Sequence, residues 1–134
     1  MKLKSPLNPL PIICSILLIT IFSCNTNPML ENWSNSDANY GGVPAFDKMN
    51  PNDVKEAMLK GMELSLKDYN TIANNLEEPT FENTIEEMER SGKLLDDVYS
   101  YYGILSSNMS SPEFRIIQGD LAPKLSEYSS KISQ

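Results

Sequence analysis

Three runs of apolar residues recur along the chain at steps of three and four positions, the spacing that places side chains on one face of an α-helix. The first run consists of Val54, Met58, Met62, Leu66, Tyr69 and Ala73. The second consists of Phe81, Ile85, Met88, Gly92, Leu95, Tyr99 and Tyr102, and Leu94, Val98, Tyr101 and Leu105 widen it. The third consists of Phe114, Ile117, Leu121, Leu125, Tyr128 and Ile132. No useful length of strand-like alternation separates these runs, so the sequence predicts an all-α protein.

Each run is preceded by residues that favour the start of a helix. Asn50 and Ser111 each stand directly before a proline, an arrangement that puts a capping side chain ahead of a proline at the first helical position. Thr80 supplies a capping hydroxyl for the second run. We therefore expect long amphipathic helices over about 51–73, 80–105 and 112–134, the third of them kinked at Pro123. The short connections predict an antiparallel array.

The first residues have the pattern of a secretory signal peptide. Lys2 and Lys4 form a short positive segment, and an apolar run over 10–22 follows it. The run is shorter than the roughly 20 residues that a membrane-spanning helix needs, so a secretory leader is favoured over a permanent transmembrane helix. The segment Ile21-Phe22-Ser23-Cys24 resembles a lipobox, the site at which signal peptidase II cuts before a cysteine, although its phenylalanine is bulkier than that pattern prefers.

This resemblance implies that residues 1–23 are a lipoprotein signal peptide and that Cys24 becomes lipid-modified. The lipid chains would anchor an exported protein to the membrane, facing the periplasm. Asn25, which follows the cysteine, favours the outer membrane. The alternative is an ordinary signal peptide, in which Cys24 merely follows a small residue.

Residues 24–46 are expected to form an irregular tether after the lipidated cysteine, because much of this segment is rich in Asn, Ser, Gly and Pro. The helical body then covers 47–134. Trp33 and Phe46 are the large apolar side chains near the tether. They either dock a partner or, as we favour, pack against the helices that follow.

Histidine is absent from the chain, which removes the commonest zinc ligand and the commonest general base. We accordingly assign no catalytic residue, no metal ligand and no cofactor to this chain. The formal charge of −7 repels phosphate backbones, so nucleic acid is not an expected partner. Cys14 and Cys24 lie within or at the end of the leader, which leaves no pair for a disulfide in the folded body.

Carboxylates are dense on the second predicted helix, and they permit two interpretations. They are Glu82, Glu86, Glu87, Glu89, Asp96 and Asp97. Paired carboxylates can perform acid–base chemistry or bind a hard cation. Their spacing instead favours a solvated face, with ion pairs Glu86–Arg90 and Glu89–Lys93.

Aromatic, methionine and glycine residues on the predicted helices also leave alternatives open. The tyrosines Tyr99, Tyr101 and Tyr102 either line a peptide channel or, as favoured, pack between helices. The methionines Met49, Met58, Met62, Met88 and Met109 either form an adaptable groove or, more simply, fill the core. Gly61 and Gly92 are expected to permit close approach of neighbouring helices.

Four segments that follow one another at compatible separations resemble the N-terminal region of M3-family zinc peptidases. They are 42–48 (Gly-Val-Pro-Ala-Phe-Asp-Lys), 79–85 (Pro-Thr-Phe-Glu-Asn-Thr-Ile), 89–92 (Glu-Arg-Ser-Gly) and 122–125 (Ala-Pro-Lys-Leu). The resemblance is to the group of peptidyl-dipeptidases and oligopeptidase A, and it runs from about residue 28 to 134. It implies a large helical metallopeptidase whose N-terminal helices help wall a channel that admits short unfolded peptides.

The same resemblance implies a catalytic module that this chain lacks. The family's His-Glu-x-x-His helix and a downstream glutamate hold zinc, and none of these ligands can be placed here. We therefore expect the chain to be the N-terminal, incomplete portion of a lipid-anchored peptidyl-dipeptidase and to be inactive in proteolysis alone. It would meet short peptides only through the complete enzyme, with the missing catalytic region as its partner. The alternative is a stand-alone helical binding module in the periplasm, anchored to the membrane.

Overall fold

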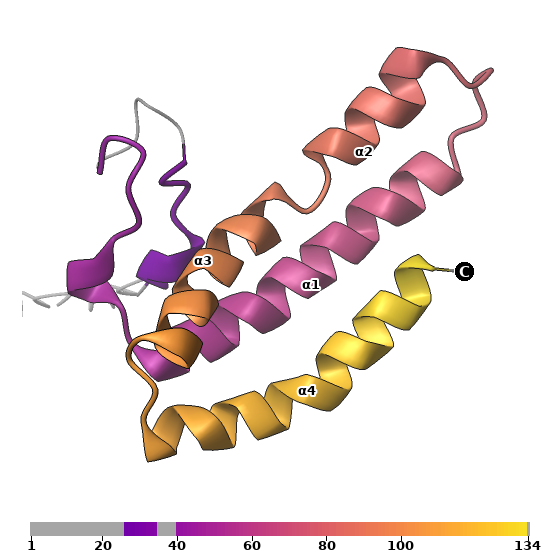
Figure 1. The fold of residues 1–134 in the computed structure, drawn as a ribbon. Coiled ribbons are helices and arrows are strands. Elements are labelled where there is room, and N and C mark those ends of the chain that lie inside the picture. Colours follow the sequence, from indigo (N-terminus) through magenta and orange to yellow (C-terminus); the bar gives the residue numbers. More distant parts are fainter. Residues whose placement is uncertain (1–25, 35–39, 134) are drawn as a thin grey trace, which may run out of the picture.

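The computed structural model of the protein describes residues 26–34 and 40–133, and within them every regular element is helical. The elements are η1 (Pro28–Leu30), η2 (Phe46–Lys48), α1 (Pro51–Ala73), η3 (Phe81–Glu86), α2 (Glu87–Arg90), α3 (Lys93–Ser107) and α4 (Pro112–Ile132). α1 lies in the middle, with α3 along one side and α4 along the other (Figure 1). The predicted all-α class with antiparallel neighbours is confirmed.

α1 begins where the capping signal predicts. The side chain of Asn50 accepts a hydrogen bond of 2.9 Å from the backbone amide of Asn52, which satisfies one of the free amides at the start of the helix. The buried part of its predicted stripe consists of Val54, Met58 and Met62. From Leu66 onward the stripe is only partly covered, and at Ala73 it is exposed. The last turns of α1 therefore carry apolar side chains that α3 and α4 leave open.

The single second helix predicted over about 80–105 is wrong, because the chain breaks it at Ser91 and Gly92. Gly92 has a φ of +79°, a left-handed backbone that glycine adopts without a steric penalty. A Cβ at this position would lie 3.1 Å from Oγ of Ser65 on α1, so the glycine also permits close approach of the two segments. The π-helical stretch η3 and the short α2 precede the break, and α3 follows it.

α4 begins at the predicted cap and contains the predicted proline. Oγ of Ser111 accepts a hydrogen bond of 3.1 Å from the amide of Phe114. Pro123 lies inside the helix, and the ribbon of α4 curves around α1 (Figure 1). In its C-terminal half, the hydroxyl groups of Tyr128 and Ser65 share a hydrogen bond of 2.8 Å. The second half of α4 therefore lies against α1.

The core lies between the three long helices, and the segment before α1 contributes to it. Its buried members are Met29, Ala45, Val54, Ala57, Met58, Met62, Leu95, Val98, Tyr101, Leu105, Phe114, Ile117 and Leu121. Trp33 and Phe46 pack edge-on against the ring of Tyr101, with centroids 6.3 and 6.4 Å away. The hydroxyl of Tyr101 accepts a hydrogen bond of 2.8 Å from the amide of Ala45. Trp33 and Phe46 therefore pack on the helical body, as favoured from the sequence.

The segment predicted as a tether is joined to the helices wherever it is described. The side chain of Asn27 donates to the carbonyl of Asp53 at 2.7 Å and accepts from the amide of Met29 at 2.9 Å. Met29 itself is fully buried. The predicted leader, residues 1–23, and Cys24 lie outside the described residues. Over 26–34 and 40–133, no helix combines the length and apolar character that crossing a bilayer requires.

Candidate functional site

A cleft separates the last turns of α1 from η3 and α2, which together form residues 81–90 and are called the arm below. The break at Gly92 ends the arm, and Figure 1 shows the arm standing apart from α1. Three hollows of about 220, 810 and 720 Å³ open along this cleft, and Ile72 lines all three. The apolar lining of the arm cleft consists of Leu66, Tyr69, Ile72, Ala73, Leu76, Met88 and Ile132.

The start of the arm is fixed by reciprocal capping. Oγ1 of Thr80 accepts from the amide of Asn83 at 3.1 Å, and Oδ1 of Asn83 accepts from the amide of Thr80 at 2.8 Å. The pKa of Glu82 is lowered, first by a hydrogen bond from its own backbone amide and then by one from the hydroxyl of Thr80. Glu82 is therefore ionised at neutral pH and makes the exposed start of the arm negative.

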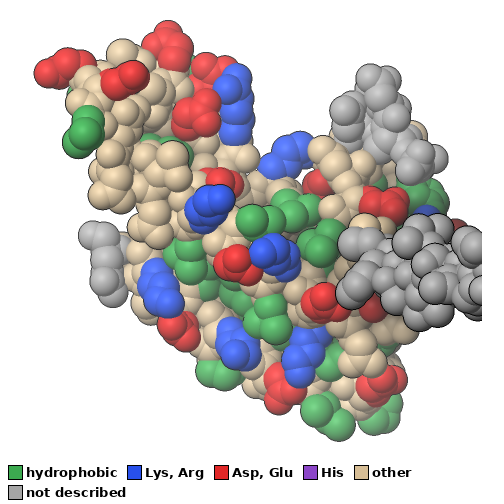
Figure 2. Space-filling model, turned by 180° about the vertical axis from the view of Figure 1, so that it is seen from behind, with side chains coloured by type: hydrophobic (Ala, Val, Ile, Leu, Met, Phe, Trp, Pro, Cys, Tyr) green, Lys and Arg blue, Asp and Glu red, His purple; other side chains and the backbone are tan. Residues whose placement is uncertain are grey.

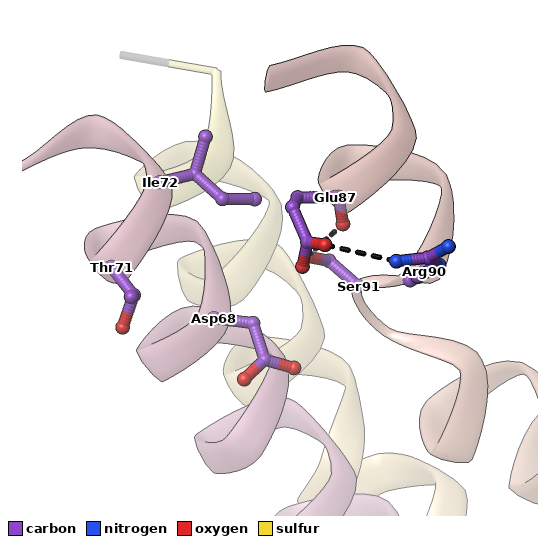
Figure 3. A pocket seen from close by; sticks show the side chains of 6 residues that line it. All are labelled: Asp68, Thr71, Ile72, Glu87, Arg90 and Ser91. Atoms are coloured by element: carbon purple, nitrogen blue, oxygen red, sulfur yellow. Dashed lines mark hydrogen bonds and ion pairs between the residues drawn. The ribbon is translucent and has the colours of Figure 1, made fainter. Parts of the chain in front are cut away.

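Charged residues on both sides of the cleft are mostly acidic. Figure 3 shows Asp68 of α1 and Glu87 of α2 on facing walls of the smallest hollow. Arg90 binds two carboxylates of its own arm, Glu87 at 3.0 Å and Glu86. The predicted pair Glu86–Arg90 is therefore confirmed. These pairs are exposed, so each contributes little to stability, but together they neutralise the positive charge of Arg90.

The predicted pair Glu89–Lys93 is wrong, because the break at Gly92 places the two residues in different helices. Within the described residues, Lys93 instead pairs with Asp97 at 3.8 Å. Asp97 was expected on a solvated face, yet it is only 6% exposed. It accepts a hydrogen bond of 3.1 Å from Oγ of Ser34. This contact explains the burial, since the segment before α1 covers that side of α3.

The cluster of Ser34, Lys93 and Asp97 brings a hydroxyl, an amine and a carboxylate together, but its geometry is that of a structural link. Nζ of Lys93 donates to Oγ of Ser34, and that hydroxyl donates to Asp97. The amine therefore acts as a hydrogen-bond donor and does not accept the serine proton, as a general base would have to do. The cluster ties residues 26–34 to α3.

The three tyrosines on α3 take different positions. Tyr101 is fully buried, and Tyr102 packs edge-on against Phe114 with the ring centroids 5.4 Å apart. Tyr99 is 38% exposed and packs edge-on against Tyr102 at 6.1 Å. Burial raises the pKa of Tyr99 and of Tyr101. Packing, favoured from the sequence, thus accounts for Tyr101 and Tyr102, whereas Tyr99 lies at the edge of the helical body.

The methionines divide between the core and the surface. Met58 and Met62 are buried, and Met49 packs partly buried against the core. Met109 is exposed, and Met88 is exposed on the wall of the arm cleft. Core filling therefore describes three of the five, and Met88 is the one that lines the candidate site.

Metal binding has no group of side chains to support it in this part of the chain. Among residues 26–34 and 40–133, no three side chains of aspartate, glutamate, cysteine or histidine gather closely enough to hold a metal ion. The residues described thus do not fit the zinc ion that the M3 resemblance implies for the complete family enzyme. What the arm cleft offers is an apolar surface bordered by carboxylates, which suits binding.

Sequence reasoning did not identify the cleft, because it expected the second helix to continue through Gly92. Ile72 and Asp68 were not singled out, although the chain break around Asn75 and Pro79 marks the turn that faces them. The visible signal for the arm was the adjacent pair of Ser91 and Gly92, since glycine after a capping residue often ends a helix. No protein-family model, no curated protein and no solved structure matches this chain.

Proposed function

We propose that the chain is the N-terminal, non-catalytic helical portion of a lipid-anchored M3 zinc metallopeptidase, a peptidyl-dipeptidase that hydrolyses short peptides. The observation that carries this proposal is the uncovered apolar face of the arm. Phe81, Ile85 and Met88 are 67%, 45% and 43% exposed. An apolar stripe left open on a packed helical body is expected where another part of a larger protein covers it.

The choice of the M3 family rests on the ordered segments 42–48, 79–85, 89–92 and 122–125, which resemble that family together and in sequence. The helical body is compatible with the wall of a peptide channel, the role that the resemblance implies for this region. In the complete enzyme, zinc would activate water for hydrolysis. The residues of this chain would shape the enclosure and exclude folded substrates, and they would take no part in bond cleavage.

The anchor in this proposal is Cys24, which would carry the lipid after removal of residues 1–23. Metabolic labelling with a fatty acid in a bacterial host tests this directly. Labelled protein is expected in the membrane fraction, with the folded body accessible to protease only after the outer membrane is opened. The Cys24→Ala variant is expected to lose the label. Equal labelling of wild type and variant would contradict the anchor.

The catalytic part of the proposal is tested by peptide hydrolysis. Residues 26–134, supplied with zinc and offered short peptides, are expected to show no turnover above that of a buffer control. The gene is expected to encode an in-frame His-Glu-x-x-His downstream of this portion. Hydrolysis by the purified chain that survives a chelator and disappears on substitution of one of its own carboxylates would refute the proposal.

One observation favours a second candidate, a stand-alone membrane-anchored binding module in the periplasm. The arm cleft provides a hollow of about 720 Å³ bordered by α1, α2 and α4, which is large enough for several side chains of a ligand. Light scattering separates the two candidates. An incomplete portion is expected to form aggregates of no fixed size as its concentration rises, whereas a complete module stays monodisperse and unfolds cooperatively.

A further inference from the structure

The arm cleft has an apolar floor and an acidic rim. Tyr69 and Ile72 of α1, Met88 of α2 and Ile132 of α4 line its hollow of about 720 Å³. Residues 74–90 carry six glutamates and one arginine, a net charge of −5. Figure 2 shows red side chains concentrated on the projecting arm at upper left, while red and blue side chains mix over the rest of that face. The rim is thus predominantly acidic beside an apolar surface, and its basic residues Arg90 and Lys131 are each paired with a carboxylate.

The charge on the rim is available to a partner. Arg90 is already bound to Glu86 and Glu87. Four other glutamates have no ion pair within the described residues, namely Glu77, Glu78, Glu82 and Glu89. Since these four are exposed, a cation approaching the cleft meets carboxylates that no basic residue of the described chain neutralises.

The exposed apolar residues of the arm have the spacing of a helix-pairing surface. Phe81, Ile85 and Met88 follow one another at steps of four and three, the pattern by which one helix packs against another. Of these three, Met88 lines the same hollow as Ile72 of α1. The surface therefore fits a helix with an apolar stripe better than it fits an extended peptide.

We propose that the arm cleft binds an amphipathic helix whose apolar stripe is flanked by lysine or arginine. We assign this helix to the portion of the peptidase that lies outside this chain, and in that respect the inference rests on the proposed function. Apolar contact with Ile72 and Met88 supplies affinity, while the acidic rim sets the orientation and rejects acidic helices.

A second copy of the chain is a poor occupant for the same cleft. Two arms brought together would place Glu77, Glu82 and Glu89 of each copy near the like charges of the other, and like charges facing across an interface are unfavourable. The whole chain carries −7, so association through this face also works against the net charge. Charge complementarity therefore selects a basic helix.

The test uses residues 26–134, which contain every core residue of the part of the chain that the structure describes, from Met29 to Leu121. The probe is a fluorescently labelled 18-residue helix of leucine and lysine, with leucines at helical spacing. The matched probe replaces every lysine with glutamate. Fluorescence anisotropy is expected to show saturable binding of the lysine probe, weakened as sodium chloride rises from 50 to 500 mM, and no binding of the glutamate probe.

Paired variants locate the binding. Met88→Asp, in the cleft, is expected to weaken binding of the lysine probe roughly tenfold, because a charge enters the apolar contact. Ile116→Asp makes the same kind of change at an exposed position of α4 outside the cleft and is expected to leave binding unchanged. Glu82→Lys reverses a charge on the acidic rim and is expected to weaken binding roughly threefold. Asp47→Lys makes the same charge reversal just before the start of α1, at the end of that helix far from the cleft, and is expected to have no effect.

Equal binding of the two probes would overturn the inference, as would equal effects of Met88→Asp and Ile116→Asp. Sedimentation of the chain alone measures whether it forms a dimer. A dimer that Met88→Asp abolishes would show that a second copy occupies the cleft and would also overturn the inference. These results are distinguishable from failure of the proposed function, which is decided by the in-frame zinc motif and by the hydrolysis assay.

Discussion

Gly61 on α1 is the position at which a single methyl group should be most informative. A Cβ built there would lie 3.0 Å from Cδ1, 3.1 Å from Cα and 3.3 Å from Cβ of Leu95. These distances are shorter than ordinary van der Waals separation, and one of the atoms belongs to the backbone of α3. Gly61→Ala therefore forces α1 and α3 apart, or shifts Leu95 within a packed core.

Two opposing terms set the size of the effect. Replacing glycine with alanine inside a helix stabilises the helix by about 1 kcal/mol, because glycine loses more backbone entropy on folding. Overpacking a well-filled contact costs about 1–3 kcal/mol. Because Leu95 is buried and backbone has to move, we expect the packing cost to prevail and the free energy of unfolding to fall by about 1 kcal/mol.

Gly103 on α3 is the matched control, because it lies inside a helix but a Cβ there has no atom within 4 Å. Gly103→Ala is expected to raise the free energy of unfolding by about 1 kcal/mol. Urea unfolding can be followed by the fluorescence of the single tryptophan, Trp33, which packs on Tyr101. With a slope of about 1 kcal/mol per molar urea, the two midpoints should move by about 1 M in opposite directions. A gain in stability for Gly61→Ala equal to that for Gly103→Ala would refute the close contact of α1 with α3.

Four further predictions concern the same helical body. Tyr101→Phe leaves the buried amide of Ala45 without its acceptor, so the free energy of unfolding should fall by about 1–3 kcal/mol in the same urea experiment. Met29→Ala leaves a cavity in the core and should cost about 2–5 kcal/mol, with faster amide exchange over residues 26–34 measured by mass spectrometry. Burial raises the pKa of Tyr101 and of Tyr128 above the ordinary value of 10.0, so the unfolded chain loses these protons first. Their contribution to stability is then complete below pH 10 and is lost as the pH rises toward the folded pKa values, and a urea midpoint unchanged from pH 9 to 11 would contradict this. Pro123→Ala restores a backbone amide inside α4 and should stabilise the protein by up to about 3 kcal/mol, with increased helical circular dichroism.

The helix starts could be predicted from the sequence because each one depends on neighbouring residues. Asn50, Thr80 and Ser111 all accept a hydrogen bond from an amide two or three positions later, as their residue types predict. The proline inside α4 is likewise visible in the sequence. The apolar stripe of α1 was also predicted, since burial of its first half follows directly from helical spacing. Local chemistry was sufficient for these features.

The break at Gly92 is not visible in the apolar spacing, which passes through it without interruption. Leu95 follows Met88 by seven positions, as it would in one continuous helix. Whether the helix continues or breaks there depends on a contact between segments distant in the sequence, the close approach of Gly92 to Ser65. Asp97 is a similar case, because its burial depends on Ser34, a residue 63 positions away. Periodicity carries no information on such partners.

The break also explains why the arm is the candidate site. The predicted stripe on either side of Gly92 is divided into two parts with different surroundings. After the break, the buried line runs through Leu95, Val98 and Tyr101, which α1 and the N-terminal segment cover. Before the break, Phe81 and Met88 keep the same helical spacing but are 67% and 43% exposed. The two parts of one sequence pattern therefore have different surroundings, since the part after Gly92 stabilises this fold and the part before it leaves apolar side chains exposed.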